Sequence, residues 1–433
     1  MIEAVRDFTI SRIGECHVDS PMRNVRYTHD DERVLYDACL HDIKPWIDKQ
    51  MDPPSMEAAG PREKIFFDPS KLACGIVTCG GICPGLNDVI RSIVLSLYHH
   101  YGVRKVYGFR FGYEGLVPRH GHVPLELAPE AVADIHEMGG TILGSSRGPQ
   151  DPAEMVKTLE DLKVGILFAL GGDGTLRGAQ KIAKEATGRG LPISVIGIPK
   201  TIDNDISFVQ TTFGFETAVA EARRATYAAN TEAEAARNSI GLVKLMGRDS
   251  GFIAAYSVLV NSNVNFCLVP EVSFTLHGFL GALRQRVEQR SHAVVVVAEG
   301  AGQDLMEKTT ERDASGNVKY GDIGVFLRDA IKEYFQQAGM EINLKYIDPS
   351  YTIRSMPANP HDSAFCLLLG QSAVHAGMSG RTNMVVSFWN HRFTHVPISL
   401  AVSARKKIDP EGILWSSVLA STGQPRDMCG PAR

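Results

Sequence analysis

Short apolar runs that end in glycine-rich turns recur along the chain from residue 73 onward. ACGIVTCGG precedes the helical pattern PGLNDVIRSIVLSLY, and VGILFALGGDG precedes TLRGAQKIAKEA. The same order returns in SIGLVKLMGRDSG before FIAAYSVLV, and AVVVVAEG predicts one more buried strand. This alternation is typical of parallel sheets covered by helices on both faces. It predicts an α/β fold built from Rossmann-like three-layer domains with parallel-rich sheets.

The two ends of the chain do not follow this pattern. Before residue 73 the periodicity is weak, apart from a helix predicted in DERVLYDACLHDIKPWIDKQ and ended by the breaker-rich MDPPSMEAAGPRE.

Two further helices are predicted in IGVFLRDAIKEYFQQAG and HDSAFCLLLGQSAVHAG. We expect an N-terminal arm over 1–72, a nucleotide-binding domain over 73–205 that can regain later segments, a sugar-phosphate-binding domain over 206–400 and a C-terminal tail over 401–433.

The apolar pattern also lapses between Gly302 and Gly321, in QDLMEKTTERDASGNVKY. The polar and charged composition of this segment predicts a mobile surface loop or a disordered hairpin. We expect it to be a poor place for chemistry.

Composition narrows the class of protein. With 433 residues, 44% of them hydrophobic, the chain can form two domains or one large domain with extensions. Its formal charge is −4, from 45 basic and 49 acidic residues spread along the chain, which argues against nucleic acid as a partner. Apolar runs fall short of the roughly 20 residues that span a bilayer. Neither a secretory signal nor a transit peptide is apparent, so we expect a cytoplasmic protein without a membrane partner.

Eight cysteines lack paired metal-ligand spacing. We therefore expect buried or inert thiols rather than structural zinc or disulfides.

Two acidic loops lie about thirty residues apart, GGDGT at Gly171–Thr175 and PKTIDND at Pro199–Asp205. Each follows an apolar run, so both are expected where buried strands end. Carboxylates beside glycine-rich turns suit metal-assisted phosphoryl transfer, because backbone amides can approach phosphate oxygens while an Asp holds magnesium. We assign Asp173 to magnesium, with an ordinary turn Asp as the alternative. Because lipid kinases and NAD kinases use a similar GGDGT loop, this motif leaves the acceptor open.

The second loop carries two acids separated by Asn204. In an extended segment Asp203 and Asp205 would point to the same side, where Thr201 can also donate a hydrogen bond. One acid can then act as a base while the other lies near the metal. An ordinary turn is the alternative, since Pro, Asp and Asn are common turn formers.

Further loops supply candidate phosphate contacts. TCGGICPGLND at Thr78–Asp88 lies between a strand and a helix, so it either cradles a phosphate or serves tight packing. Arg248 in LMGRDSGFIA and Arg147 in GGTILGSSRG are cations that can neutralise phosphate oxygens, although single arginines are usually solvated or paired.

Two later motifs fit a sugar phosphate. Glu299 ends the VVVV run, where a carboxylate can bind sugar hydroxyls or can simply cap a helix or turn. Tyr351 and Arg354 in YTIR combine a phenol and a guanidinium, which can grip a sugar phosphate.

Taken in order, the motifs TCGGICPGLND, FGYEGL, GGTILGSSRG, GGDGT, PKTIDND, KLMGRDSGFIA, PEVSF, VVAEGA and YIDPSYTIR resemble the series found in the 6-phosphofructokinases. The resemblance covers about residues 60–380. It implies the phosphofructokinase fold and a glycolytic kinase, an allosteric enzyme in much of the family. The kinase transfers a phosphoryl group to the C1 hydroxyl of fructose 6-phosphate.

The resemblance also implies a role for each matching residue. Asp203 is expected to take the proton of the C1 hydroxyl, with Asp205, Arg248 and Thr201 completing the catalytic set, and Asp173 would hold magnesium. The implied nucleotide contacts are Gly81, Arg147, Gly148, Gly172, Asp173, Gly174, Thr175 and Lys200. The implied sugar-phosphate contacts are Thr201, Ile202, Asp203, Met246, Gly247, Arg248, Glu299, Lys345, Tyr351 and Arg354. Lys345 resembles a cation lent by a neighbouring subunit, which implies a homodimer or homotetramer.

The family contains ATP and pyrophosphate users. Pyrophosphate users typically carry Asp where this chain has Gly174, and Gly leaves room for the α-phosphate of a nucleotide without repelling it. At position 200, in contrast, this chain carries the Lys typical of pyrophosphate users, where the familiar bacterial ATP enzymes have Gly. This mixture, with the AGPREKIFFDP arm, resembles the ATP-dependent branch of plants and trypanosomatids, so ATP with Mg²⁺ is expected and pyrophosphate is the alternative. Ser239 stands where many bacterial relatives carry Arg, so the effector stays open.

Two other classes of function stay in view. A kinase acting on NAD or lipid shares GGDGT, although PKTIDND and YTIR argue against it. A catalytically silent regulatory subunit would bind the same ligands, although the intact acidic and basic set argues against it.

Overall fold

The computed structural model describes residues 7–307, 310–312 and 318–430, and these residues form two compact units. The first unit contains the described residues up to Thr201 together with 206–214 and 356–404. The second contains 202–205, 215–355 and the described residues from Arg405 onward. The boundary expected at residue 205 coincides with one of the points where the chain passes from one unit to the other. Residues 206–214 and 356–400, expected in the second domain, lie in the first unit, as do 401–404 of the expected tail.

The first unit is built on a nine-stranded sheet with the strand order β3-β4-β17-β16-β10-β9-β6-β7-β8. Its strands are β3 (Arg33–Leu35), β4 (Ser55–Ala58), β6 (Ala73–Thr78), β7 (Lys105–Phe109), β8 (Leu125–Glu126), β9 (Val164–Gly171), β10 (Ser194–Pro199), β16 (Met384–Trp389) and β17 (Arg392–Pro397). The five strands from β16 to β7 are parallel, and antiparallel strands complete both edges. Two small antiparallel pairs join β1 (Ser11–Arg12) to β15 (Arg381–Thr382) and β2 (Val18–Asp19) to β5 (Lys64–Ile65).

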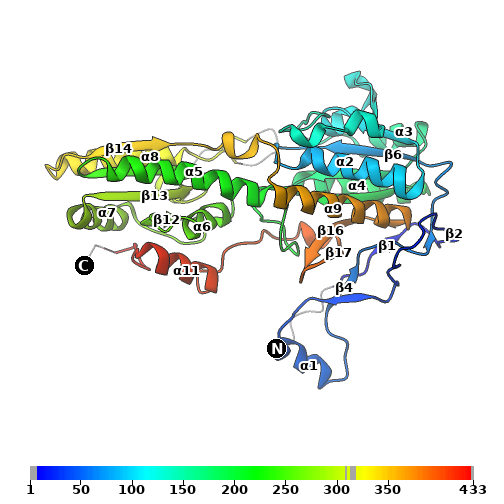
Figure 1. The fold of residues 1–433 in the computed structure, drawn as a ribbon, viewed down its shortest axis with the longest axis horizontal. Helices are drawn as coiled ribbons and strands as arrows, with labels where there is room; N and C mark the ends of the chain where they lie inside the picture. The colour runs from blue at the N-terminus through cyan, green and yellow to red at the C-terminus, as the bar shows by residue number, and fades with distance from the viewer. Residues whose placement is uncertain (1–6, 308–309, 313–317, 431–433) are drawn as a thin grey trace. The chain divides into compact units, whose positions relative to one another are not determined.

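Helices cover both faces of this sheet. They are α2 (Leu86–Ser96), α3 (Pro152–Asp161), α4 (Asp173–Gly188), α9 (Pro360–Met378) and α10 (Ile398–Ala401), and a π-helical turn (Leu97–Tyr101) continues α2. Helix α1 (Leu40–Ile47) instead lies in the N-terminal arm (Figure 1). Leu167 and Ala169 of β9 share a core with α3, α4 and α10. Ile166, on the opposite face, contacts Gly377 of α9, and α2 lies alongside α9 (Figure 1). The first unit therefore has three layers.

The second unit contains a fully parallel sheet with the order β12-β13-β11-β14. Its elements are β11 (Ser239–Leu245), β12 (Phe266–Leu268), β13 (His292–Ala298), β14 (Asn343–Ile347), α5 (Phe215–Glu234), α6 (Phe252–Leu259), α7 (Leu276–Arg290), α8 (Ile323–Gln337) and α11 (Ile413–Thr422). Ile240 and Leu242 of β11 face the core under α7 and α8, while Gly241 faces Ala229 of α5. The α/β prediction is confirmed, because alternating apolar runs fold into parallel strands between helices.

The predicted strand and helix pairs at β6, β9 and β11 are present, as is the single strand predicted at β13, whereas two predictions at the chain ends need correction. The helix expected in DERVLYDACLHDIKPWIDKQ is confined to α1, because Val34 instead pairs with Met56 in the sheet and is buried. From Arg405 onward the expected tail is part of the second unit: α11 packs on α6, and Gln424 hydrogen-bonds both backbone groups of Cys267. Of the segment expected to be a loop, residues 308–309 and 313–317 lie outside the described residues.

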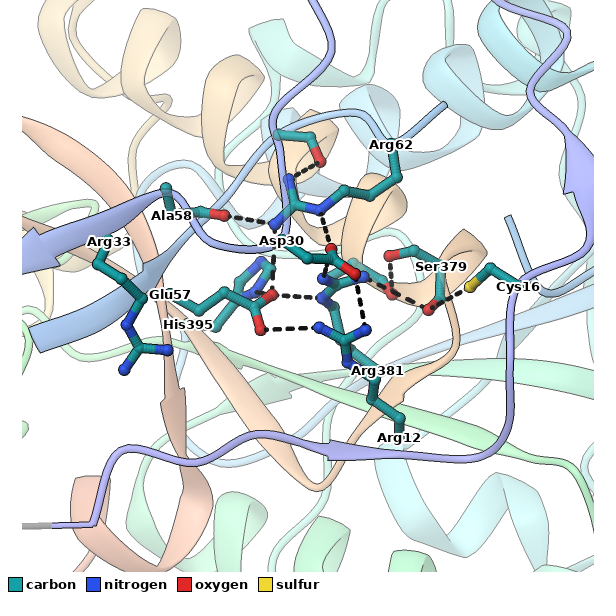
Figure 2. A network of polar contacts seen from close by, with 12 residues as sticks. Arg12, Cys16, Asp30, Arg33, Glu57, Ala58, Arg62, Ser379, Arg381 and His395 are labelled. Atoms are coloured by element: carbon teal, nitrogen blue, oxygen red, sulfur yellow. Dashed lines mark hydrogen bonds and ion pairs between the residues drawn. The ribbon is translucent and has the colours of Figure 1, made fainter. Parts of the chain in front are cut away.

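A buried polar network attaches the N-terminal arm to the sheet (Figure 2). Glu57 of β4 accepts hydrogen bonds from Arg381, from Arg62 (3.3 Å) and from the His395 ring (3.0 Å). Asp30 accepts from Arg62 at 3.0 Å and from Arg381 at 2.7 Å. Burial alone would raise the pKa of Glu57, but these partners outweigh it and hold the pKa well below its usual range. The arm is thus fixed by buried charge pairs as well as by strand pairing.

No helix of the described residues is both long and apolar enough to cross a bilayer.

Candidate active site

The carboxyl ends of β6, β9 and β10 meet at one edge of the first unit's sheet, since Thr78 pairs with Leu170 and Pro199 with Gly171. Beyond them, the Gly80 N–H donates to the Ser146 carbonyl at 3.0 Å. These contacts bring the predicted phosphate loop, the GSSRG segment and the GGDGT turn to the same edge, where ligands of parallel sheets bind.

Lys200 links these loops. Its Nζ donates to the carbonyl of Gly81 at 2.5 Å, its backbone N–H donates to Gly171 at 3.1 Å, and the residue is buried. In the same group of loops Arg147 is exposed, and Gly148 has a φ of 104°, which favours glycine. The predicted nucleotide contacts of the first unit therefore lie on neighbouring loops.

Helix α4 begins within the GGDGT turn. Gly172 is its N-cap residue and Asp173 its first residue, so the amides of the first turn are available to an anion. A Cβ placed on exposed Gly174 would have no heavy atom within 4 Å, so the fold itself tolerates a side chain there. Thr175 is 6% exposed and its carbonyl accepts from Tyr113 at 2.7 Å, so it supports the turn from inside.

The donor set at this turn fits magnesium only together with a bound phosphate. Within residues 7–307, 310–312 and 318–430 no group of three or more His, Cys, Asp or Glu side chains could hold a metal ion. Mg²⁺ in phosphoryl-transfer enzymes is commonly held by one or two carboxylates, with substrate phosphates and water completing its octahedron. The Asp173 carboxylate, at the start of α4 beside glycine amides, is the type of ligand this arrangement requires.

The PKTIDND segment differs from the extended conformation expected. Ile202 and Asp203 form a turn, and Asn204 has a φ of 54°, in the left-handed region. Asn tolerates this conformation better than most residues. The acids are therefore presented by a turn after β10, and alternation along a strand does not determine their directions. Before the turn, the carbonyl of Thr201 accepts from Thr212 at 2.7 Å.

Within the second unit this turn lies against the end of β11. Burial, the charge of Asp205 and the charge of Glu299 together raise the pKa of Asp203 well above its usual value. The backbone N–H of Arg248 hydrogen-bonds the Asp203 carboxylate and partly opposes this rise. The structure thus brings together three of the residues predicted from separate motifs, and it gives Asp203 a raised proton affinity.

The loops after β11 and β13 fit closely against each other. The Glu299 N–H donates to Leu245 at 2.9 Å, and the Gly300 N–H donates to Gly247 at 3.0 Å. A Cβ on Gly300 would lie 1.9 Å from the carbonyl oxygen of Arg248, so only glycine fits. This contact explains the glycine of VVAEGA and fixes Glu299 beside the MGR segment.

A cluster of cations surrounds Glu299. Burial raises its pKa, while the charges of Arg248, Lys244 and Arg354 oppose the rise. The guanidinium carbon of Arg354 lies 5.0 Å from the ring centroid of Tyr351. Its Nε is buried and has no hydrogen-bond partner within the described part of the chain, a state typical of a donor that awaits a ligand.

The other predicted sugar-phosphate residues occupy varied positions in the second unit. Ile202 is buried, Met246 is half-buried and Tyr351 is 76% exposed. Lys345 lies on β14 opposite Gly241 and is exposed.

Two features near Arg248 were missed in the sequence. Tyr320 lies in the segment expected to be a poor place for chemistry, and its ring centroid is 4.5 Å from the Arg248 guanidinium. The same guanidinium donates a hydrogen bond to the carbonyl of Val318. Arg405, in the expected tail, pairs with Asp205 at 2.6 Å. The run of three basic residues from 405 to 407 was the available signal, but nothing in the sequence indicated which acids it meets.

Comparison with known proteins decides the family. The family model described as Phosphofructokinase matches residues 73–377. The chain belongs to the phosphofructokinase family. An ATP-dependent 6-phosphofructokinase of Borreliella burgdorferi is 48% identical, with 98% of each chain covered. The Trypanosoma cruzi protein of the same name is 48% identical over 95% of this chain and 87% of its own. The family expected from the motif series is confirmed.

Solved structures agree on the fold. A structure described as a pyrophosphate-dependent phosphofructokinase from Marinobacter aquaeolei matches with a TM-score of 0.67 at 20% identity. The match covers 83% of this chain and 92% of that chain. At this identity the likeness establishes the phosphofructokinase fold alone. The roles of individual site residues stay predictions.

Proposed function

We propose that this protein is an ATP-dependent 6-phosphofructokinase of glycolysis. It transfers the γ-phosphoryl group of ATP to the C1 hydroxyl of fructose 6-phosphate, which gives fructose 1,6-bisphosphate and ADP. The observation that carries the proposal is the grouping of Asp203, Arg248 and Glu299 in the second unit of a chain that belongs to this family.

In the proposed mechanism Asp203 accepts the proton of the C1 hydroxyl. Its raised pKa makes it a stronger base than an ordinary exposed Asp, which suits general-base catalysis near neutral pH. Arg248 stabilises charge on the transferring phosphoryl group, and Thr201 contacts it. Glu299 binds sugar hydroxyls, and Arg354 with Tyr351 binds the 6-phosphate, which matches the buried Nε without a partner in the described part of the chain.

The nucleotide is bound by the loops of the first unit. Gly81, Arg147, Gly148 and the first turn of α4 contact its phosphates, and Asp173 would hold Mg²⁺, which would neutralise charge on the phosphates. Two observations support ATP as the donor: the space at Gly174 is open, and relatives that align over nearly the whole chain carry the name of the ATP-dependent enzyme.

A coupled assay that detects fructose 1,6-bisphosphate tests the proposal. Purified protein is given fructose 6-phosphate with ATP or with pyrophosphate, each with and without Mg²⁺. We expect turnover with ATP and Mg²⁺, and its loss when the metal is chelated. No turnover with ATP, while NAD or a lipid is phosphorylated, would revive the kinases that share GGDGT. No turnover with any acceptor would support a regulatory subunit.

Pyrophosphate is the second candidate donor, and one observation favours it. Lys200 is buried and its ammonium contacts the loop that contains Gly81, a position from which it can pair with a compact diphosphate. Equal or faster turnover with pyrophosphate in the same assay would replace ATP by this donor.

We also propose that the enzyme is a cytoplasmic homodimer or homotetramer in which Lys345 reaches the sugar phosphate of a neighbouring subunit. Its exposure on β14 is compatible with this role. Sedimentation of the purified protein measures the oligomer. A monomer with full activity would contradict the proposal.

A further inference from the structure

We propose that Arg405 and Lys406 form a clamp that holds the Ile202–Asp205 turn in the conformation used for phosphoryl transfer. Both are positioning residues: they contact the acidic turn, while Asp203 meets the substrate. The inference rests on the proposed function, and it assigns a role in catalysis to a segment that the sequence suggested was only a tail. All residues of the clamp belong to the second unit.

The turn needs support because two features of it are unfavourable. Asn204 is held in the left-handed conformation, which costs free energy in residues other than glycine. Asp205 also lies close enough to Asp203 for its negative charge to raise the pKa of Asp203. Without external partners, the backbone would relax and the acids would separate.

Arg405 compensates the charge of the acids. Its guanidinium donates to Oδ2 of Asp205 at 2.6 Å, and its Nε lies 3.8 Å from Asp249. The side chain of Asp205 is 3% exposed, so this contact replaces the hydration that the carboxylate has lost. The positive charge of Arg405 also opposes the rise in the pKa of Asp203.

Lys406 holds the backbone of the turn. Its N–H donates to the carbonyl of Asp205 at 2.8 Å, and its Nζ donates to Oδ1 of Asn204 at 3.0 Å. The same ammonium lies 5.3 Å from the ring centroid of Phe252, and the Lys406 carbonyl accepts from the hydroxyl of Ser250. Lys406 therefore connects the left-handed residue to the start of α6.

Glu271 secures the clamp to the loop that presents Arg248. Its carboxylate accepts from the N–H of Ile408 at 2.9 Å and from the N–H of Gly251 at 3.0 Å. The segment that follows the clamp and the MGRDSG loop thus share one carboxylate. As a result, the position of the base is coupled to the position of the cation that stabilises the phosphoryl group.

The predicted effect is on turnover rather than on substrate affinity. Misplacement of a catalytic group by about 1 Å can lower the rate roughly 100-fold. We expect Arg405→Met and Lys406→Met each to lower kcat by about 10- to 100-fold, while KM for ATP and for fructose 6-phosphate changes less than about threefold. Arg405→Lys, which keeps the charge, should recover part of the loss.

A pH profile separates positioning from a general loss of structure. Burial has the largest effect on the pKa of Asp203, and the neighbouring groups that shift it further are Asp205, Glu299, the Arg248 amide and Arg405. Removal of the positive charge at position 405 should therefore raise the pKa of the base and move the acidic limb of the kcat profile to higher pH.

Lys407→Met is the matched control, because Lys407 is exposed and belongs to the same basic run. It should leave kcat, KM and the pH profile unchanged. Thermal unfolding verifies that each variant is folded. If Arg405→Met does not fold, the two single variants Arg405→Lys and Lys406→Met are used for the test instead. Wild-type kcat and pH profile in folded Arg405→Met, or in both fallback variants, would overturn the clamp while the proposed function stands. A wild-type protein inactive on fructose 6-phosphate would overturn both.

Discussion

Gly174→Asp tests the choice of phosphoryl donor at a position where the fold does not interfere. A Cβ at residue 174 meets no heavy atom within 4 Å, the residue is exposed, and it lies in the first turn of α4. Asp is favourable near a helix N-terminus and replaces the poorest helix former after proline. The variant should therefore fold at least as stably as the parent protein, so any lost activity reports on the ligand.

The expected magnitude follows from charge repulsion. Two unit charges about 4 Å apart repel by roughly 1 kcal/mol in water and by about 4 kcal/mol at the dielectric of a protein surface. Each 1.4 kcal/mol changes a dissociation constant about tenfold, so these two limits correspond to a rise in KM for ATP of roughly 5-fold and roughly 700-fold. KM for fructose 6-phosphate should stay within about threefold.

Steady-state kinetics with varied ATP measures this effect, and Gly174→Asn is the uncharged control of the same shape. We expect the Asn variant to raise KM for ATP much less than the Asp variant does. Equal effects would mean that the nucleotide is excluded by size. An unchanged KM for ATP in Gly174→Asp would refute the reasoning by which Gly174 indicates ATP.

Three further predictions concern the base, the arm and the dependence of stability on pH. Asp203→Asn should lower kcat on the order of 10² to 10⁴ with KM nearly kept, and near-normal turnover in steady-state assays would contradict its role. Arg381→Met removes one of the cations that pair with the buried Glu57 carboxylate, so urea titration should show a loss of about 3–5 kcal/mol, and less than 1 kcal/mol would contradict the network. Burial lowers the pKa of His375 to about 3 and of His395 to about 4. Below about pH 6.5 the unfolded chain therefore binds protons that the folded chain does not. The free energy of unfolding should fall between pH 7 and pH 4 by up to roughly 1–3 kcal/mol per pH unit. Denaturation at several pH values measures this slope, which His395→Asn should reduce.

The sequence predicted the fold because each local signal agrees with the tertiary structure. Buried parallel strands need continuous apolar runs, and their ends need glycine where backbone approaches backbone or ligand. The Gly300 contact with Arg248 is one such case. The segment DERVLYDACLHDIKPWIDKQ shows where local signals fail. Its apolar positions suit one helix, but Val34 is instead part of strand β3 and pairs with Met56 at the edge of the sheet.

The site was predicted only in part. The motifs singled out Asp203, Arg248 and Glu299, which the structure brings together, while their roles stay predictions. Alternation along an extended strand wrongly described how the acids are presented, because residues 202–203 form a turn and Asn204 has a left-handed conformation. Arg405 was not found, since it is 200 residues from Asp205 in sequence and nothing local indicates its partner.

By itself, the sequence determined which residue types stand at the ends of which strands, since periodicity and glycine placement are local properties. Only the tertiary structure decided which side chains form hydrogen bonds or ion pairs with each other. Desolvation and pairing depend on segments that approach each other after folding, as Glu57, Arg381 and His395 do in the arm and Asp205 and Arg405 do at the acidic turn.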